Sequence, residues 1–492
     1  MMHGSGKSDE AIVAVKPANK AETSAAEPVE RRASTKRNAG QQSTDRTLSR
    51  TAVTQALERI RQTARERKKE RFTALLHHID TDLLEAEFFA LEKHAAAGVD
   101  GMTWRDYGQS LRSNLEDLQA RVHRGAYRPL PSRRVYIPKP DGRQRALAIA
   151  ALEDKIVQRA VAAVLNAIYE EDFLGFSYGF RPGRSAHDAM DALVVAIERR
   201  KVNFILDADI RSFFDTVSQD WLIRFVEHRV GDKRIIRLIR KWLRAGVLED
   251  GIVSVSGKGT AQGAVISPLL ANIYLHYALD LWVERFRRRE TTGDMIVVRY
   301  ADDFIVGFEH EHEARGFLDA LRERLGEFAL SLHVEKTRLI EFGRNAESNR
   351  KRCGLGKPET FNFLGFTFIC GKSRRGKFLI KRKSRRDRMH VKLQAIKQDL
   401  RRRMHQSIPV QGKWLRQVIQ GYFNYHAVPT NIGSIGSFRD EAVRGWWQSL
   451  RRRSQRHSLD WERMKQLADA WLPKPEIRHP WPNQRFAVRY SR

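Results

Sequence analysis

Two short runs of strand-forming residues flank a pair of acids in the stretch MIVVRYADDFIVGF, Met295 to Phe308. Val, Ile and aromatic residues favour pleated strands, and a connection of two residues suits a tight hairpin turn. The sequence therefore predicts a β-hairpin with Asp302 and Asp303 at its tip. Taken alone, such a pair is more often a solvated turn, because Asp is a favoured turn residue.

A further acid follows another apolar run. In FILDADIRSFFD, Phe204 to Asp215, a strand-like segment runs out into Asp209. Acids at strand ends that face each other would raise one another's pKa unless a cation lay between them. Mg²⁺ takes oxygen ligands and is usually held by one or two carboxylates plus substrate phosphates. We therefore predict two Mg²⁺ ions at Asp209, Asp302 and Asp303, an arrangement that activates an attacking 3′-hydroxyl and stabilises a leaving pyrophosphate.

Composition limits the class of protein. Among 492 residues, 89 Lys and Arg stand against 59 Asp and Glu, and the formal charge of +30 indicates a polyanionic partner. No apolar run is long enough to span a bilayer, and residues 1–20 lack the apolar core of a secretory signal, so we expect no membrane partner. The two cysteines, Cys353 and Cys370, exclude a disulfide framework and a Cys-based zinc site, which fits a reducing, cytoplasmic location.

Five ordered motifs resemble one protein family. Tyr300 to Asp303 is similar to the YxDD box of reverse transcriptases, and DADIRSFFD resembles the preceding acidic motif of the polymerase palm. With SYGFRPGRSAHDA, GTAQGAVISPLLANIYL and FNFLGF, these motifs resemble the reverse transcriptase/maturase proteins encoded by group II introns over roughly residues 55–485. The resemblance implies an α+β right-hand polymerase, with fingers and palm built on antiparallel sheet, followed by an α-helical thumb/maturase domain.

Composition and resemblance together divide the chain into four parts. Residues 1–50 have almost no aromatics, which predicts a disordered basic tail. Helical spacing and strong positive charge from Thr51 to Ile79 predict an N-terminal helical extension over 51–95. We expect the fingers and palm over 96–370 and a thumb/maturase RNA-binding domain over 371–485.

The resemblance also implies residues that would hold the incoming nucleotide. Lys139 and Arg145 flank the turn of a predicted fingers hairpin, where they would bind the triphosphate. Phe214 would lie under the sugar and clash with a 2′-hydroxyl, which implies selection of dNTPs. Gln262 and Gly263 would lie against the nascent base pair. A solvated hairpin and a plain turn before a helix are the alternatives for the first and last of these segments.

Two further segments are assigned by the same resemblance. Leu332 to Thr337 is similar to an LHxxKT stretch of the family, in which Lys336 would neutralise the departing pyrophosphate. An exposed lysine without this role is the alternative. Phe363, Leu364 and Gly365 resemble the primer grip, a turn that presses the primer end toward the acids.

A basic segment follows. From Gly371 to Val410 there are 15 Lys or Arg and two acids, and aromatic residues come next. This pattern fits an RNA-binding helical surface better than a membrane-facing one. The predicted RNA contacts are Arg382, Arg385, Arg386 and Arg388.

The motifs together imply an RNA-directed DNA polymerase that copies RNA into cDNA and binds its intron RNA to assist splicing and mobility. Its partners would be structured intron RNA, an RNA template with a DNA primer, and dNTPs. The same polymerase recruited to another system, such as phage defence, and a splicing-only maturase are the alternatives. The intact Asp209, Asp302 and Asp303 favour the enzyme, because a protein that acts only in splicing can lose them. The sequence does not set the oligomeric state.

Overall fold

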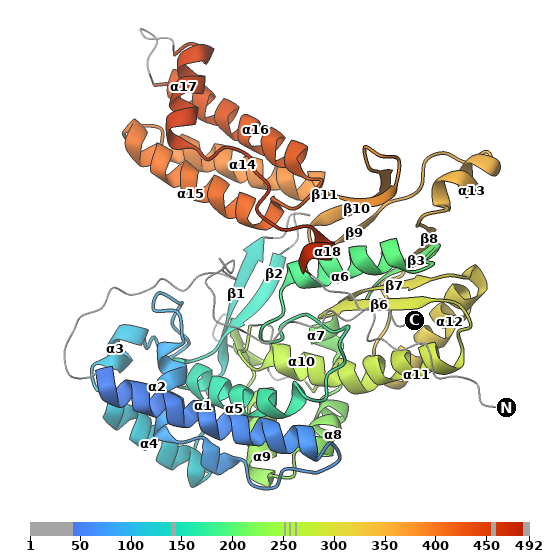
Figure 1. Ribbon diagram of the computed structural model, residues 1–492. Coiled ribbons are helices and arrows are strands. Elements are labelled where there is room, and N and C mark those ends of the chain that lie inside the picture. Colours follow the sequence, from blue (N-terminus) through green and yellow to red (C-terminus); the bar gives the residue numbers. More distant parts are fainter. Residues whose placement is uncertain are drawn as a thin grey trace, which may run out of the picture.

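A computed structural model of the chain describes residues 43–138, 144–249, 252–254, 257–260, 263–453 and 459–485. At its centre lies a four-stranded antiparallel sheet with helices on both sides (Figure 1). In spatial order the strands are β6 (Met295–Tyr300), β7 (Asp303–Phe308), β3 (Phe204–Asp209) and β8 (Arg338–Glu341). The hairpin predicted around the two acids is the β6–β7 pair.

Apolar side chains alternate between the two faces of this sheet, and each face meets its own helices. Val297 and Phe304 belong to the core that contains residues of α10 (Ser267–Leu275) and α12 (Glu311–Glu327). Val298 and Ile305 point to the opposite face, against α6 (Ala186–Arg199). A strand buried on both faces tends to be apolar on both, which explains the apolar run Met295 to Val298 of β6.

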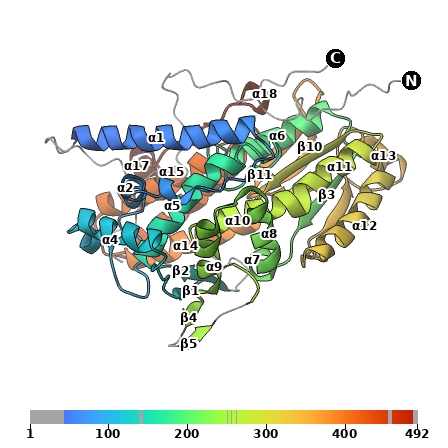
Figure 2. The same ribbon diagram turned by 90° about the horizontal axis from the view of Figure 1, so that it is seen from below.

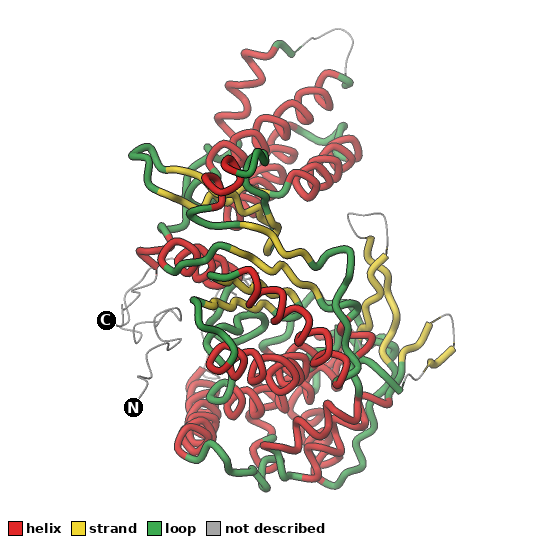
Figure 3. The backbone as a smooth tube through the Cα atoms, turned by 90° about the vertical axis from the view of Figure 1, so that its right-hand side faces the viewer, coloured by secondary structure: helices red, strands yellow, loops and turns green. Residues whose placement is uncertain are grey.

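The N-terminal half of the described chain consists mainly of helices packed around α5 (Leu152–Tyr169), whose bounds agree with the predicted helix. The other helices of this part are α1 (Ser43–Glu66), η2 (Leu76–His78), α2 (Thr81–Phe89), α3 (Trp104–Gly108), α4 (Leu111–His123), α8 (Gln219–Arg229) and α9 (Lys233–Arg244). Two hairpins form its sheet and project from the edge of the molecule (Figure 3). Their strands are β1 (Ser132–Pro138), β2 (Gln144–Ile149), β4 (Val247–Glu249) and β5 (Ile252–Ser254).

The N-terminal helix differs from its predicted bounds. Helix α1 lies along α5 (Figure 2), begins at Ser43 and ends at Glu66 instead of running on to Ile79. The guanidinium of Arg229 donates to the carbonyls of residues 64, 67, 68 and 70. These bonds satisfy carbonyls that a helix end leaves without partners, so a distant residue stabilises the end of α1. The tail predicted over 1–50 otherwise lies outside the described residues.

A second, short sheet shares a core with one face of the central sheet and leads into a helical C-terminal part. The sheet has the order β11-β10-β9, with strands β9 (Phe361–Phe363), β10 (Phe366–Lys372) and β11 (Phe378–Ser384). The helices are α14 (Arg386–Arg402), α15 (Ile408–His426), α16 (Ile432–Arg451), α17 (Trp461–Trp471) and α18 (Pro482–Arg485). The domain boundary expected after residue 370 therefore falls inside β10, and the basic segment begins as a hairpin rather than a helix.

Four short elements complete the described chain: α7 (Phe213–Thr216), the π-helical turn η3 (His276–Asp280), α11 (Leu281–Arg289) and α13 (Ala346–Arg352). The mixed α+β architecture, with antiparallel sheets and a helical C-terminal region, agrees with the fold class expected from the sequence. Among the described helices, none is long and apolar enough to cross a membrane.

Candidate active site

The three predicted acids lie at one end of the central sheet. Asp209, the last residue of β3, is paired in register with Asp303, the first residue of β7. Tyr300 pairs with Asp303 across the hairpin, so Ala301 and Asp302 form the two-residue turn. The sequence predicted both acids at the tip, but Asp303 is the first residue of β7 and only Asp302 lies in the turn. Residues directly opposite on antiparallel strands share a face, so Asp209 and Asp303 point to the same side.

Like charges gather on this face. Burial and the neighbouring carboxylates of Asp302, Asp209 and Asp207 raise the pKa of Asp303 to about 7. Asp303 is nevertheless exposed to solvent. A bound cation would remove the part of the pKa shift that repulsion among the carboxylates causes. Burial, opposed by Arg338, also raises the pKa of Asp207 to about 6.

Sequence reasoning missed Asp207. It stands two residues before Asp209 in β3, and side chains two residues apart in a strand point to the same face. The spacing of the two acids in the run FILDAD was the signal that could have identified it.

Lys336 approaches the acids from the loop that follows α12. Its Nζ lies 2.5 Å from Oδ2 of Asp209, and the backbone N–H of His333 donates to the Asp209 carbonyl at 2.8 Å. The lysine side chain is about half exposed, at 54%. The loop thus places the Lys336 ammonium group beside Asp209. The exposed side chain can also turn away toward solvent.

The donor set fits a hard divalent cation only when a substrate contributes. Among the described residues, no group of three or more His, Cys, Asp or Glu side chains is placed to hold a metal ion. Mg²⁺ is commonly bound by one or two carboxylates together with substrate phosphates. The opposed pair Asp209 and Asp303 fits that mode, with Asp302 in the adjacent turn.

Comparisons with known proteins agree with this geometry. A family model described as "Reverse transcriptase (RNA-dependent DNA polymerase)" matches residues 137–368. Protein YkfC of Escherichia coli (strain K12) is 32% identical over 333 residues, which cover 61% of this chain and 83% of YkfC. Group II intron-encoded protein LtrA of Lactococcus lactis subsp. cremoris is 33% identical over 235 residues, 47% of this chain and 39% of LtrA. The chain belongs to the group II intron reverse transcriptase/maturase family.

Other relatives share shorter regions. A protein of Schizosaccharomyces pombe described as an uncharacterized 91 kDa protein in cob intron is 41% identical over 157 residues, 32% of this chain and 19% of that protein. This chain therefore spans well under half the length of LtrA and of the S. pombe relative. The match to the reverse transcriptase family includes the acids of β3 and β7, so the chain carries the domain of an RNA-directed DNA polymerase.

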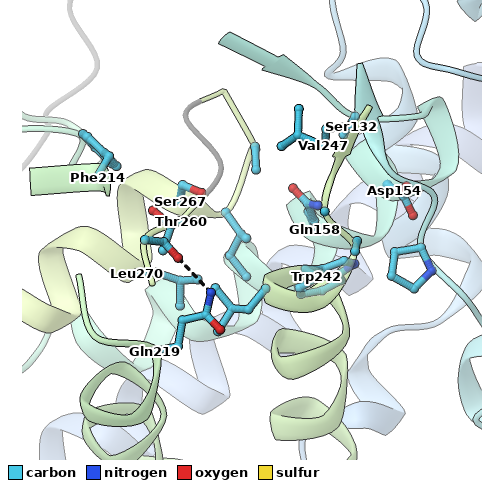
Figure 4. A pocket seen from close by; sticks show the side chains of 18 of the residues that line it. Ser132, Asp154, Gln158, Phe214, Gln219, Trp242, Val247, Thr260, Ser267 and Leu270 are labelled. Atoms are coloured by element: carbon cyan, nitrogen blue, oxygen red, sulfur yellow. Dashed lines mark hydrogen bonds between the residues drawn. The ribbon is translucent and has the colours of Figure 1, made fainter. Parts of the chain in front are cut away.

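Phe214 of the reverse transcriptase lies in α7 and is half-buried, with its ring edge against Phe213. It lines one side of a cavity of about 190 Å³, and Asp154 and Gln158 line the other (Figure 4). None of the three predicted catalytic acids lines this cavity. Phe214 thus lines the cavity from the short helix that follows β3 in the chain, and its contact to a sugar stays a prediction.

The other predicted nucleotide contacts are only partly placed. Lys139 and Gln262 lie outside the described residues, and Arg145 is placed in β2 without a described side chain. At Gly263, φ is +110° and an added Cβ would lie 2.7 Å from the carbonyl oxygen of Ala148. Packing against β2 therefore requires a glycine here, whether or not a base pair lies against it.

The predicted primer grip is a tight turn between β9 and β10. Phe363 is buried, and both Leu364 (φ +46°) and Gly365 (φ +84°) adopt left-handed backbone conformations. The hydroxyl of Tyr425, in α15, donates to the Leu364 carbonyl at 2.8 Å. Phe363 packs in the same core as Ile305, on the acid-bearing face of the central sheet. The turn thus connects the acid-bearing face to helix α15.

The four arginines predicted to contact RNA have different environments. Arg382 is buried at 2% exposure and forms an ion pair with Asp191 of α6, so the prediction that it contacts RNA is wrong. Its position in β11, which the basic composition concealed, turns it toward the core. Arg385 is paired with Asp387 at 2.5 Å, whereas Arg386 and Arg388 are exposed at the start of α14.

Proposed function

We propose that this protein copies RNA into cDNA from dNTPs, with two Mg²⁺ ions at Asp209, Asp302 and Asp303. The observation that supports this most directly is the register of β3 and β7, which opposes Asp209 and Asp303 beside the turn that bears Asp302. Burial and the carboxylates of Asp302, Asp209 and Asp207 raise the pKa of Asp303, and a divalent cation would relieve this repulsion.

Metal ions bound here would activate the primer 3′-hydroxyl and stabilise the charge of the leaving pyrophosphate. The chain's own residues orient the substrates. The turn at Phe363 to Gly365 supports the primer end on the same face as the acids. Lys336, whose Nζ lies next to Asp209, holds a proton close to where the pyrophosphate departs. Phe214 limits the space beside the sugar and so favours dNTPs over rNTPs.

We further propose that the protein binds structured intron RNA and assists splicing and mobility. The relative LtrA is named as a group II intron-encoded protein. The net charge of +30 and the exposed arginines of α14 suit a polyanion with closely spaced phosphates.

Substitution of the acids tests the polymerase half of the proposal. We expect Asp302→Ala and Asp209→Ala each to lower Mg²⁺-dependent cDNA synthesis on a primed RNA template by about 10³-fold or more, because the metal stabilises several kcal/mol of transition-state charge. RNA affinity should stay near wild type, since backbone contacts are a separate contribution.

Asp319→Ala is the control, because Asp319 is an exposed acid of α12 that pairs with Arg322. Its activity should equal that of the wild type. Full polymerase activity in Asp302→Ala or Asp209→Ala would contradict the assignment of the site.

A further inference from the structure

The side chain of Arg299, in β6, is completely buried behind the acidic turn and uses all of its N–H groups. Nε and Nη2 donate to the carboxylate of Asp280 at 2.7 and 2.5 Å. Nη2 also donates to Oγ of Ser177 at 2.7 Å. Nη1 donates to Oδ1 of Asn272 at 3.2 Å and to the carbonyl of Ala301 at 2.9 Å. A guanidinium has five N–H donors, so these five bonds occupy every one.

Stability alone does not explain this arrangement. Burial of an ion pair costs several kcal/mol per ion, and apolar residues of similar volume often hold a core as well or better. A guanidinium whose donors all meet fixed partners has a single orientation. Because one of the bonds of Arg299 ends on the Ala301 carbonyl, that orientation is transmitted to the turn between β6 and β7.

The turn needs such support because its backbone is strained. Ala301 has a φ of +58°, and the left-handed conformation costs an L-residue roughly 1–2 kcal/mol. Gly179 packs directly against it, since a Cβ at position 179 would lie 2.3 Å from the Ala301 nitrogen. Asn272 joins the two supports: its Nδ2 donates to the Gly179 carbonyl at 2.7 Å, and its Oδ1 accepts from Arg299.

The π-helical turn η3 brings two of these partners onto one side. Asn272 lies in α10, and Asp280 is the last residue of η3. In a regular α-helix, residues eight positions apart point about 80° away from each other. A π turn accommodates one extra residue, so the two side chains become nearly aligned, roughly 20° apart by the same geometry. Both therefore reach Arg299.

We propose that Arg299 is a positioning residue for nucleotide addition. It holds the Ala301 carbonyl and thereby the orientation of the carboxylates of Asp302 and Asp303, while Asp280, Asn272 and Ser177 fix Arg299 itself. The inference deepens the proposed function, on which it rests. Weakening this network changes metal affinity and turnover and leaves the primer and RNA surfaces intact, since these lie on other elements.

The test compares Arg299→Lys with Arg229→Lys. A lysine keeps a charge near Asp280 but cannot also serve the three other partners of Arg299. Arg229 is a matched control: it is 1% exposed and ion-paired with Asp172 at 2.8 Å. Its guanidinium also donates to the carbonyls at the end of α1 and lies over the ring of Phe72. The measurements are Tm, and kcat and KM for dNTP in primer extension. Mn²⁺ affinity is read by electron paramagnetic resonance on the protein bound to dNTP and to a primer–template whose primer lacks a 3′-hydroxyl, because substrate phosphates complete the metal site.

We expect Arg299→Lys to lower kcat by about ten-fold or more, with KM for dNTP near wild type at saturating Mg²⁺, because the residues proposed to contact the nucleotide lie on other elements. Mn²⁺ affinity should fall by a similar factor. Arg229→Lys should lower Tm and leave kcat and Mn²⁺ affinity unchanged. Equal losses of activity in both variants at equal Tm, or wild-type Mn²⁺ affinity in Arg299→Lys, would overturn the proposal.

A gentler variant covers the case in which Arg299→Lys does not fold. Asn272→Asp keeps an acceptor for Arg299 but has no N–H to donate to the Gly179 carbonyl. The same drop in kcat and in Mn²⁺ affinity is expected for it, and wild-type values of both would contradict the positioning role. Absence of primer extension by the wild-type protein would count against the proposed function instead, since Mn²⁺ binding reports on the turn without polymerisation.

Discussion

Asp303 gives the acid face a measurable pH dependence. Its folded pKa of about 7 lies above the ordinary 3.8, so between these values the folded protein holds a proton that the unfolded chain has released. Stability without metal therefore falls as pH rises through this window. We expect a loss of about 1–2 kcal/mol in unfolding free energy between pH 5 and pH 8, less than the full shift implies, because solvent screens an exposed carboxylate.

Urea unfolding in EDTA at these two pH values, with Asp303→Asn beside the wild type, measures the effect. The Asn variant cannot ionise, so its stability should change less with pH and exceed that of the wild type at pH 8. Asp319→Asn, on the exposed face of α12, should keep the wild-type pH dependence. Parallel curves for the wild type and Asp303→Asn would show that the carboxylates do not repel one another as described.

The role of a residue could be predicted from the sequence where the residues beside it in the chain mark its position. Asp209, Asp302 and Asp303 follow strand-forming runs, and strand pairing alone brought them together. Arg382 was misassigned because its partner Asp191 lies far away in the sequence. Arg299 was overlooked for the same reason, since its partners come from three separate segments.

For the turn between β9 and β10, a role in primer binding can be tested separately from the cost of backbone strain. The turn between β10 and β11 provides the comparison. Gly365 has a φ of +84°, and Gly376, in the turn between β10 and β11, has a φ of +75°. An added Cβ at Gly365 would lie 3.6 Å from Tyr425, in ordinary contact, and one at Gly376 would meet open space. Alanine at either position therefore has a similar backbone cost, roughly 1–2 kcal/mol.

We expect Gly365→Ala and Gly376→Ala to lose comparable unfolding free energy, but only Gly365→Ala should raise KM for the primer–template, by several-fold. Alanine strains either turn, which then relaxes to another conformation. Only the turn that contains Gly365 faces the primer in the proposed function. Denaturant unfolding and steady-state primer extension on the two variants provide the comparison. An unchanged KM in Gly365→Ala would remove the primer-grip assignment.

The boundaries of helices and strands were also predictable only where residues of the same segment determine them. The helix at Leu152–Tyr169 and the β6–β7 hairpin were predictable, because the periodicity of their own apolar residues defines them. The end of α1 was not, since Arg229 supplies the donors that end it. The β10–β11 hairpin was concealed because its exposed positions are basic and few buried apolar residues, such as Phe368 and Ile380, mark it as sheet.

The net charge of +30 indicates a polyanionic partner for the molecule as a whole. Burial of Arg382 leaves Arg386 and Arg388 as the exposed members of the predicted RNA-contacting set that have no carboxylate partner within the described ion pairs. Each phosphate that a cation neutralises releases counterions, so RNA affinity falls steeply with salt. The guanidinium of Arg388 also lies close to Gly365, which places this charge beside the turn proposed as the primer grip.

We expect the double variant Arg386→Gln, Arg388→Gln to flatten the slope of log affinity for structured intron RNA against log salt by about 1.4–1.8, or 0.7–0.9 per lost contact. Arg315→Gln, Arg322→Gln is the matched control, because these α12 arginines are neutralised by Glu311 and Asp319. The control removes the same net charge and should leave the slope nearly unchanged.

Extension of a short generic primer–template, measured on the same proteins at two salt concentrations, separates the two uses of this surface. If α14 serves chiefly to hold intron RNA, the double variant loses more in intron binding than in extension, because the acids of β3 and β7 remain in place. Equal losses in both assays would show that α14 clamps the primer–template duplex, as the position of Arg388 beside the primer-grip turn also allows. The maturase half of the proposed function would then have to be abandoned, while the polymerase half would stand.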